Sequence, residues 1–207
     1  MIEILNETNE IILSGVVGDG WGDDPITKGG VRKALKAFGD GPITVRINSP
    51  GGAADEGIDI FNILRDYPGE VTTINDSLAA SAASVIFLAG SKRLMNDGSR
   101  VMIHRAMSIA FGNQEEIRKT LQALESYDAS LLDIYSQYLT EGKAAIEAML
   151  SAETWFGVDE AIESGLATAR YGKETDKKKK KMTSQFDQAK SNWLRAKMAQ
   201  FTKGLGK

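Results

Sequence analysis

The sequence contains no cysteine and a single histidine, His104. Without cysteine the chain cannot form a disulfide framework, a thiolate zinc site or a cysteine nucleophile, and one imidazole cannot build a multi-histidine metal centre. No apolar run approaches the roughly 20 residues that span a bilayer. The first ten residues, MIEILNETNE, lack the basic region and apolar core of a secretory signal. These absences predict a soluble cytoplasmic protein with no metal site and no membrane contact.

Charge is distributed unevenly along the chain, although the net charge is only −3. Residues 172–207 carry eleven lysines and arginines against three acids, whereas residues 1–171 carry a net charge of −11. Five consecutive lysines occupy residues 177–181, and apolar residues then recur three or four apart. This pattern predicts an acidic folded domain at residues 1–171 and a basic linker with an amphipathic tail at residues 172–207.

Strand and helix patterns alternate along residues 1–171. Apolar, β-branched runs predict strands, and apolar residues three or four apart predict helices. Strands are expected at residues 11–13, 43–47, 71–74, 100–104 and 166–171. Helices are expected at residues 28–38, 54–66, 78–90, 113–139, 143–150 and 158–164, with tight turns at residues 48–52 and 75–77. The alternation predicts an α/β domain with a largely parallel sheet.

Ser81 and His104 are the candidates for covalent catalysis. Ser81 lies near the start of the predicted Ala-rich helix, where small neighbours admit a substrate and free backbone N–H groups favour an oxyanion. A serine hydroxyl needs an adjacent base, and histidine titrates near neutral pH. Each residue also has a structural interpretation: Ser81 and Ser84 as small packing residues, and His104 as the last residue of a strand.

The segment NSPGG at residues 48–52 follows a predicted strand directly. Paired glycines adopt positive φ and can present backbone N–H groups to a bound carbonyl. The alternative is an ordinary turn between a strand and a helix. A phosphate-binding loop is disfavoured, because the Walker lysine and serine do not follow.

Four of these motifs, taken in order, resemble the ClpP family of serine peptidases. They are INSPGG at residues 47–52, AAS at 79–81, AG at 89–90 and SRVMIH at 99–104. EAIESGL at residues 160–166 is similar to the closing helix and turn of that family. The resemblance covers roughly residues 10–170. It implies the ClpP/crotonase fold, which stacks βαβ units and carries a long projecting helix.

The finer pattern is most similar to the ClpP-like head-maturation proteases of tailed phages. It consists of LAASAAS at residues 78–84 and ETWF at residues 153–156. The N-terminal segment with which ClpP forms axial loops has no counterpart before the first predicted strand. The resemblance therefore argues against dependence on a Clp ATPase and for the phage type.

The resemblance also implies a role for individual residues. Ser81 matches the nucleophile and His104 the general base, and the backbone N–H groups of Gly52 and Ala82 match the oxyanion hole. Glu153 falls where the family usually has the aspartate of the triad. Glutamate is one methylene longer, but it can still accept the Nδ1 proton of the histidine.

The function implied is endoproteolysis of scaffold and capsid proteins during prohead maturation, within proheads in the host cytoplasm. The resemblance implies a homo-oligomeric ring, a heptamer or paired heptamers, without a cofactor. Nucleic acid is disfavoured as a partner, because the acidic domain repels phosphates.

Two alternatives to this function stay open. One is a crotonase-type acyl-CoA enzyme, which does not need the pair of Ser81 and His104. The other is a catalytically inactive assembly or scaffolding protein.

Overall fold

The computed structural model of the chain describes residues 1–20 and 24–172. Contacts divide the chain into two units, Met1–Tyr171 and Gly172–Lys207. The predicted basic linker and amphipathic tail lies, apart from residue 172, outside the described residues, and it stays a prediction. The first unit contains the candidate site.

One mixed sheet organises the first unit. Its strands are β1 (Ile2–Leu5), β2 (Glu10–Val17), β3 (Ile43–Gly52), β4 (Val71–Ala80), β5 (Lys92–Met95), β6 (Arg100–Ile103), β7 (Thr154–Phe156) and β8 (Ala169–Arg170). Six of them follow the order β1-β2-β3-β4-β5-β8, while β6 pairs with β4 and β7 pairs with β6. The β1–β2 and β6–β7 pairs are antiparallel and the others are parallel. The predicted α/β domain with a largely parallel sheet is therefore confirmed.

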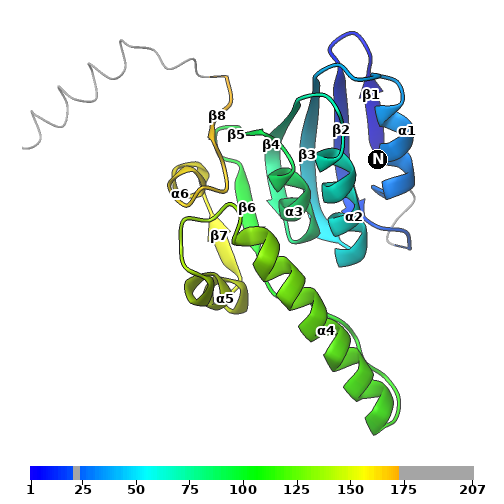
Figure 1. Cartoon of the computed structure of the whole chain (residues 1–207), viewed down its shortest axis with the longest axis vertical. Coiled ribbons are helices and arrows are strands. Elements are labelled where there is room, and N and C mark those ends of the chain that lie inside the picture. The colour runs from blue at the N-terminus through cyan, green and yellow to red at the C-terminus, as the bar shows by residue number, and fades with distance from the viewer. Residues whose placement is uncertain (21–23, 173–207) are drawn as a thin grey trace, which may run out of the picture. The chain divides into compact units, whose positions relative to one another are not determined.

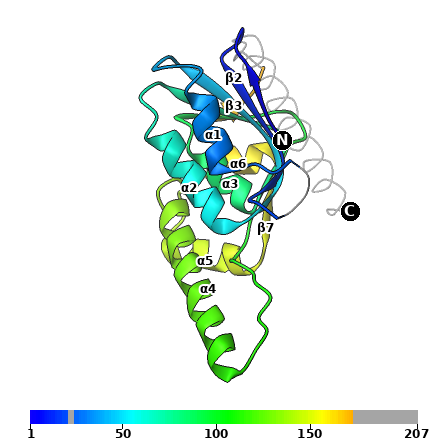
Figure 2. The same ribbon diagram turned by 90° about the vertical axis from the view of Figure 1, so that its right-hand side faces the viewer.

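Helices cover the sheet and extend beyond it. They are α1 (Lys28–Leu35), α2 (Ala54–Arg65), α3 (Ala82–Leu88), α4 (Gln114–Tyr135), α5 (Lys143–Ser151) and α6 (Val158–Glu163). Figures 1 and 2 show α1, α2 and α3 on the same face of the sheet, with α4 projecting away from the body. The apolar side chains of the first three helices, such as Val31, Ile60 and Phe87, are fully buried. Burial of this face stabilises the domain in proportion to the apolar area removed from water.

The long helix α4 is anchored to the body only near its C-terminal end. It begins with a capping box, in which the Asn113 side chain accepts from the Glu116 backbone and the Glu116 carboxylate accepts from the Asn113 backbone. The buried residues of α4 are Leu131, Ile134 and Tyr135, all in its last two turns. The earlier turns form an arm, which confirms the predicted projecting helix within residues 113–139.

The turns predicted at residues 48–52 and 75–77 are wrong. Both segments belong to long strands, since β3 continues to Gly52 and β4 continues to Ala80. The buried amide of Asn75 donates to the Arg100 carbonyl at 2.8 Å, and this tertiary bond takes the place of the local turn. The helix predicted at residues 78–90 consequently begins only at Ala82.

Several other boundaries differ from the predicted ones. The predicted helix 28–38 ends at Leu35, and the predicted strand 166–171 is reduced to two residues. The strands β1, β5 and β7 were not predicted, because three or four residues are too few to show a period. These short strands form through pairing with partners distant in sequence.

The strand β4 positions the candidate site because it has two partners on one side. Its first half pairs with β5, from Thr72 to Asn75, and its second half pairs with β6, from Leu78 to Ala80. The same strand therefore connects the main sheet to the shorter β6–β7 pair. Its carboxyl end, and that of β6, lie side by side.

Two features are absent from the described part of the chain. None of its helices combines the length and the apolar character needed to cross a bilayer. Residues 1–20 and 24–172 contain no group of three or more histidine, cysteine, aspartate or glutamate side chains arranged to hold a metal ion.

Candidate active site

Ser81 is the single residue between the end of β4 and the start of α3. Its backbone has φ 53° and ψ −127°, a conformation that residues other than glycine seldom adopt. The Ser81 N–H donates to the Met102 carbonyl of β6 at 2.9 Å. A strained serine on a sharp turn from strand to helix is the arrangement in which a nucleophile is exposed to substrate.

His104 follows the last residue of β6 and faces Ser81. The parallel register pairs Ala80 with Met102, which brings the residues after each strand to the same edge of the sheet. The His104 Nε2 atom lies 2.7 Å from the Ser81 Oγ atom, within hydrogen-bond distance. Both residues are half-buried. The structure thus brings together the predicted nucleophile and the predicted base.

The glycine pair at the end of β3 lies against Ser81. A Cβ atom on Gly51 would approach the Ser81 Cβ and the Ala80 carbonyl oxygen to 2.6 Å each, and one on Gly52 would approach the Val17 carbonyl oxygen to 2.0 Å. Both residues have positive φ. Only glycine fits either position, so the NSPGG segment passes directly beside the serine.

The two backbone N–H groups predicted for the oxyanion hole belong to Gly52 and Ala82. Ala82 is the first residue of α3, so its N–H has no partner within that helix. The neighbouring Gly51 N–H is occupied, since it donates to the Ser49 Oγ at 3.1 Å. The close approach of Gly51 to Ser81 places the end of β3 next to the first turn of α3.

Glu153 lies opposite His104, but the two are not hydrogen-bonded. The antiparallel register pairs Ile103 with Thr154, so the next position brings Glu153 level with His104. Within residues 24–172, however, the hydrogen-bond partner of the Glu153 carboxylate is the Trp155 indole, whose Nε1 donates to Oε1 at 3.2 Å. Glu153 is exposed and has φ 52°. Its role as the third triad member stays a prediction.

A second carboxylate contacts the segment that follows His104. The Asp128 Oδ1 atom of α4 accepts from the Ala106 backbone N–H at 2.8 Å. Its Oδ2 atom lies 3.8 Å from the Arg105 guanidinium. Asp128 is therefore bound to the loop that follows His104.

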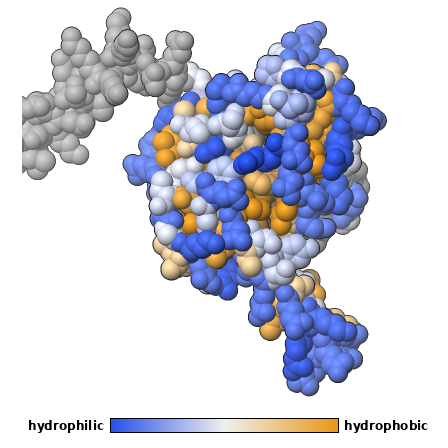
Figure 3. Space-filling view, viewed as in Figure 1, coloured by the Kyte–Doolittle hydropathy of each residue, from blue (hydrophilic) through white to orange (hydrophobic). Residues whose placement is uncertain are grey.

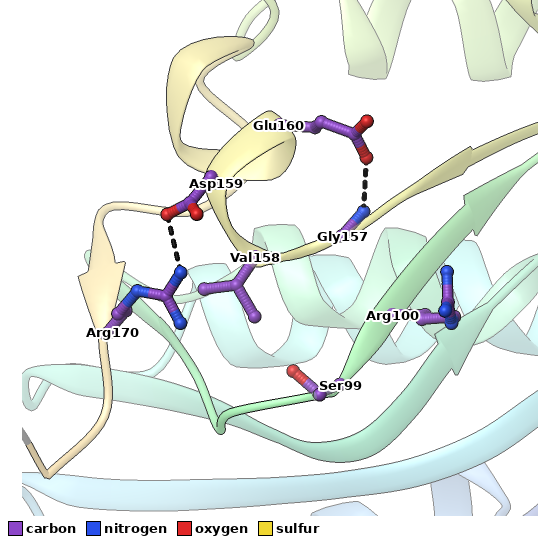
Figure 4. Close-up of a pocket in the computed structure, with 8 residues that line it drawn as sticks. Ser99, Arg100, Gly157, Val158, Asp159, Glu160 and Arg170 are labelled. Carbon is purple, nitrogen blue, oxygen red and sulfur yellow. Dashed lines mark hydrogen bonds and ion pairs between the residues drawn. The ribbon is translucent and has the colours of Figure 1, made fainter. Parts of the chain in front are cut away.

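A separate shallow hollow of about 380 Å³ lies at the other end of β6. Its lining residues are Gly98, Ser99, Arg100, Gly157, Val158, Asp159, Glu160 and Arg170. Figure 4 shows Arg170 reaching across to Asp159, with a nitrogen-to-oxygen distance of 2.6 Å, and the Glu160 carboxylate accepting from the Gly157 N–H. Arg170 also pairs with Asp97. These contacts fix the start of α6, and the hollow contains none of the predicted catalytic residues.

Sequence reasoning did not single out Gly51 or Trp155. The only sequence signal for Gly51 is its place beside Gly52 in the NSPGG segment. The prediction assigned a role to Gly52, whereas the structure places Gly51 in the closer contact with Ser81. Trp155 is two residues from Glu153, and residues two apart share a face of an extended chain. Neither contact can be located without the tertiary structure.

Comparisons with known proteins identify the family of this chain. A family model described as Clp protease matches residues 33–174, which is more than half of the chain. The chain belongs to the Clp protease family. Its relatives indicate a serine-type peptidase, so the predicted enzyme class is confirmed.

Two relatives are named as ATP-dependent Clp protease proteolytic subunits. Subunit 1 of Protochlamydia amoebophila is 36% identical over 129 residues, which cover 60% of this chain and 63% of the relative. The chain thus spans less than two thirds of that relative. Subunit 2 of Treponema denticola is 31% identical over 168 residues, which cover 80% of this chain and 82% of the relative.

A solved structure gives the same fold. A point mutant of ClpP1 from Listeria monocytogenes aligns with a TM-score of 0.71 and 21% identity, covering 82% of this chain and 94% of that one. The predicted ClpP/crotonase fold is therefore confirmed. These names identify Clp proteolytic subunits, and the phage head-maturation type stays a proposal.

Proposed function

We propose that this chain is an endopeptidase in which Ser81 is the nucleophile and His104 the general base. The observation that carries the proposal is the 2.7 Å separation of the Ser81 Oγ and His104 Nε2 atoms at the edge where β4 and β6 end. A neutral imidazole nitrogen at that distance can take the hydroxyl proton as the oxygen attacks a carbonyl. An inactive assembly protein has no need of this pairing.

The reaction would proceed in two halves. In the first, Ser81 Oγ bonds to the carbonyl carbon while His104 takes its proton, and the imidazolium then protonates the leaving amine to give an acyl-enzyme. In the second, His104 takes a proton from water as the water oxygen attacks the ester carbon, and it returns that proton to Ser81 Oγ as the ester C–O bond breaks and the acid product leaves. The developing oxyanion in both halves would be held by the N–H groups of Gly52 and Ala82.

A fluorophosphonate probe tests this function directly. Such probes form a covalent bond only with an activated serine. We expect one labelled serine per chain, identified by mass spectrometry of the labelled peptide. A folded chain without any labelling would instead favour the inactive assembly protein.

For the substrate, we propose the scaffold and capsid proteins of a phage prohead. Two observations support this choice: the similarity of residues 78–84 and 153–156 to head-maturation proteases, and the strongly basic segment that follows the peptidase domain. The test is incubation of the purified chain with a purified phage scaffold protein. Cleavage without a nucleotide is expected.

The names of the relatives favour a second candidate, a proteolytic subunit served by an ATPase. The two candidates differ in what cleavage requires. A proteolytic subunit would degrade a folded protein only when a Clp ATPase and ATP are present. Without the ATPase it would leave most of the scaffold protein uncleaved. Measuring both substrates with and without the ATPase separates the candidates.

We expect the chain to form a homo-oligomer, most simply a heptameric ring or a pair of rings. The arm formed by α4 and the loop before it carries exposed apolar side chains, and Figure 3 shows apolar surface at the base of the arm. The most exposed are Met107, Ile109 and Phe111, at 77%, 95% and 97%. Apolar surface of this kind is typical of an association site. Light scattering at micromolar concentration should give a multiple of the chain mass.

A variant pair makes the oligomer prediction specific. Ile109→Ser combined with Phe111→Ser should lower the measured mass, because both side chains are almost fully exposed in the single chain. Ser108→Ala changes the exposed residue directly before Ile109 and should leave the mass unchanged. A wild-type chain that scatters as a monomer would contradict the prediction.

The basic segment is proposed to tether the protease to its substrate. Residues 172–207 carry a charge of +8, which suits an acidic partner, and tethering raises the effective concentration of substrate. Deletion of these residues should leave cleavage of a short peptide unchanged and weaken incorporation into proheads. Incorporation is measured by quantitative blotting of purified proheads, and equal incorporation of both forms would reject the tether.

A further inference from the structure

Two buried hydroxyl groups, those of Ser84 and Tyr135, form a chain of contacts to Ser81. Ser84 of α3 and Tyr135 of α4 are each only 1% exposed. The Ser84 Oγ atom donates to the Ser81 carbonyl oxygen at 2.6 Å, and the Tyr135 hydroxyl lies 2.6 Å from the same Ser84 Oγ. A chain of hydrogen bonds therefore runs from the last turn of α4 to the backbone of the predicted nucleophile.

The direction of the protons in this chain follows from its chemistry. A carbonyl oxygen can only accept, so the single Ser84 hydroxyl proton points to Ser81. Ser84 Oγ must then accept, and Tyr135 must donate. Burial raises the pKa of the Tyr135 hydroxyl, so it keeps its proton at neutral pH. Both buried hydroxyls are thus satisfied in one arrangement only.

This arrangement acts on a residue whose backbone is strained and held by several hydrogen bonds. The Ser81 carbonyl accepts from the Ser84 backbone N–H at 2.9 Å as well as from the Ser84 hydroxyl. Its N–H donates to Met102, and its side chain meets His104. Ser81 holds a positive φ, and such a conformation persists only where neighbouring contacts over-determine it.

We infer that Tyr135 and Ser84 are positioning residues, which hold the Ser81 backbone so that its Oγ stays aimed at His104. The inference rests on the proposed function, because it gives Ser84 and Tyr135 no role except through the nucleophile. Neither residue is a substitute nucleophile, since both are buried and their hydroxyls are fully engaged. Ser84 is thus more than the small packing residue that the sequence also allowed, because its hydroxyl donates a hydrogen bond to the Ser81 carbonyl.

The test compares the rate of probe labelling in matched variants. Tyr135→Phe removes one oxygen atom and keeps the ring in the core. We expect the maximal labelling rate to fall roughly tenfold, which is the order of one lost hydrogen bond, with the half-saturating probe concentration unchanged. Ser84→Ala should cause a similar fall. The double variant should be no slower than Ser84→Ala alone, because the Tyr135 hydroxyl then has nothing left to orient.

Controls separate positioning from general stability. Tyr127→Phe, also on α4 and half-buried, removes a hydroxyl that makes no hydrogen bond within residues 24–172, and should label at the wild-type rate. Thermal unfolding of each variant is measured alongside. A Tyr135→Phe protein that unfolds at a lower temperature but labels at the wild-type rate would overturn the inference. A roughly hundredfold fall in the labelling rate of the double variant, the product of the two single effects, would also overturn it. A wild-type chain that never labels would overturn the proposed function itself.

Discussion

Replacing Ser81 by alanine should abolish probe labelling and peptide hydrolysis while the fold survives. The substitution removes only the Oγ atom that lies 2.7 Å from His104 Nε2. The backbone bonds of residue 81 to Met102 and Ser84 do not involve that atom and remain. In another serine protease, loss of the nucleophile costs on the order of 10⁶-fold in kcat. Peptide hydrolysis, probe labelling and circular dichroism measure the three outcomes.

Ser84 provides the matched control for this experiment. It lies one helical turn further along the same Ala-rich segment and carries the same hydroxyl group. Because Ser84 is 1% exposed and bonded to Tyr135, Ser84→Ala should still be labelled at Ser81, although more slowly. Labelling that persists in Ser81→Ala and disappears in Ser84→Ala would move the nucleophile to Ser84.

The fold class was predictable because apolar residues recur at clear strand and helix spacings along the chain. Residues 43–47, 54–65 and 114–135 show the expected apolar spacing, and the structure forms a strand and two helices there. The turn predicted at residues 75–77 failed for a physical reason. Asn75 is typical of turns, but here its amide is buried and bonds to β6, so tertiary contacts override the local preference.

The candidate site was predictable in identity but not in geometry. Motif order pointed to Ser81 and His104, which are 23 residues apart in sequence. Their contact depends on the parallel register of β4 with β6, and a register between separate strands cannot be derived from either strand alone. The positive φ of Ser81 and the hydroxyl chain from Tyr135 likewise arise only when three elements pack together.

Glu153→Gln should lower kcat by about 10⁴-fold, the loss that follows when the histidine of an analogous triad takes the wrong tautomer. The reason is the position of Glu153 opposite His104 in the β6–β7 register. As the acid of the triad, Glu153 would exchange the Trp155 indole for the imidazole as its partner. Glu153→Asp keeps the carboxylate and should retain substantial activity. Steady-state hydrolysis of a peptide by the three proteins gives kcat and KM separately.

Trp155→Phe and Asp128→Asn are the controls that decide which carboxylate orients His104. Trp155→Phe removes the indole N–H that Glu153 accepts from, so it should leave kcat unchanged or raise it if Glu153 is the acid. Asp128→Asn should have a smaller effect than Glu153→Gln, because Asp128 bonds to the Ala106 backbone and keeps an oxygen acceptor there as asparagine. Full activity of Glu153→Gln together with a large loss in Asp128→Asn would instead assign the acid to α4. The triad would then join the arm to the sheet through the loop that carries His104.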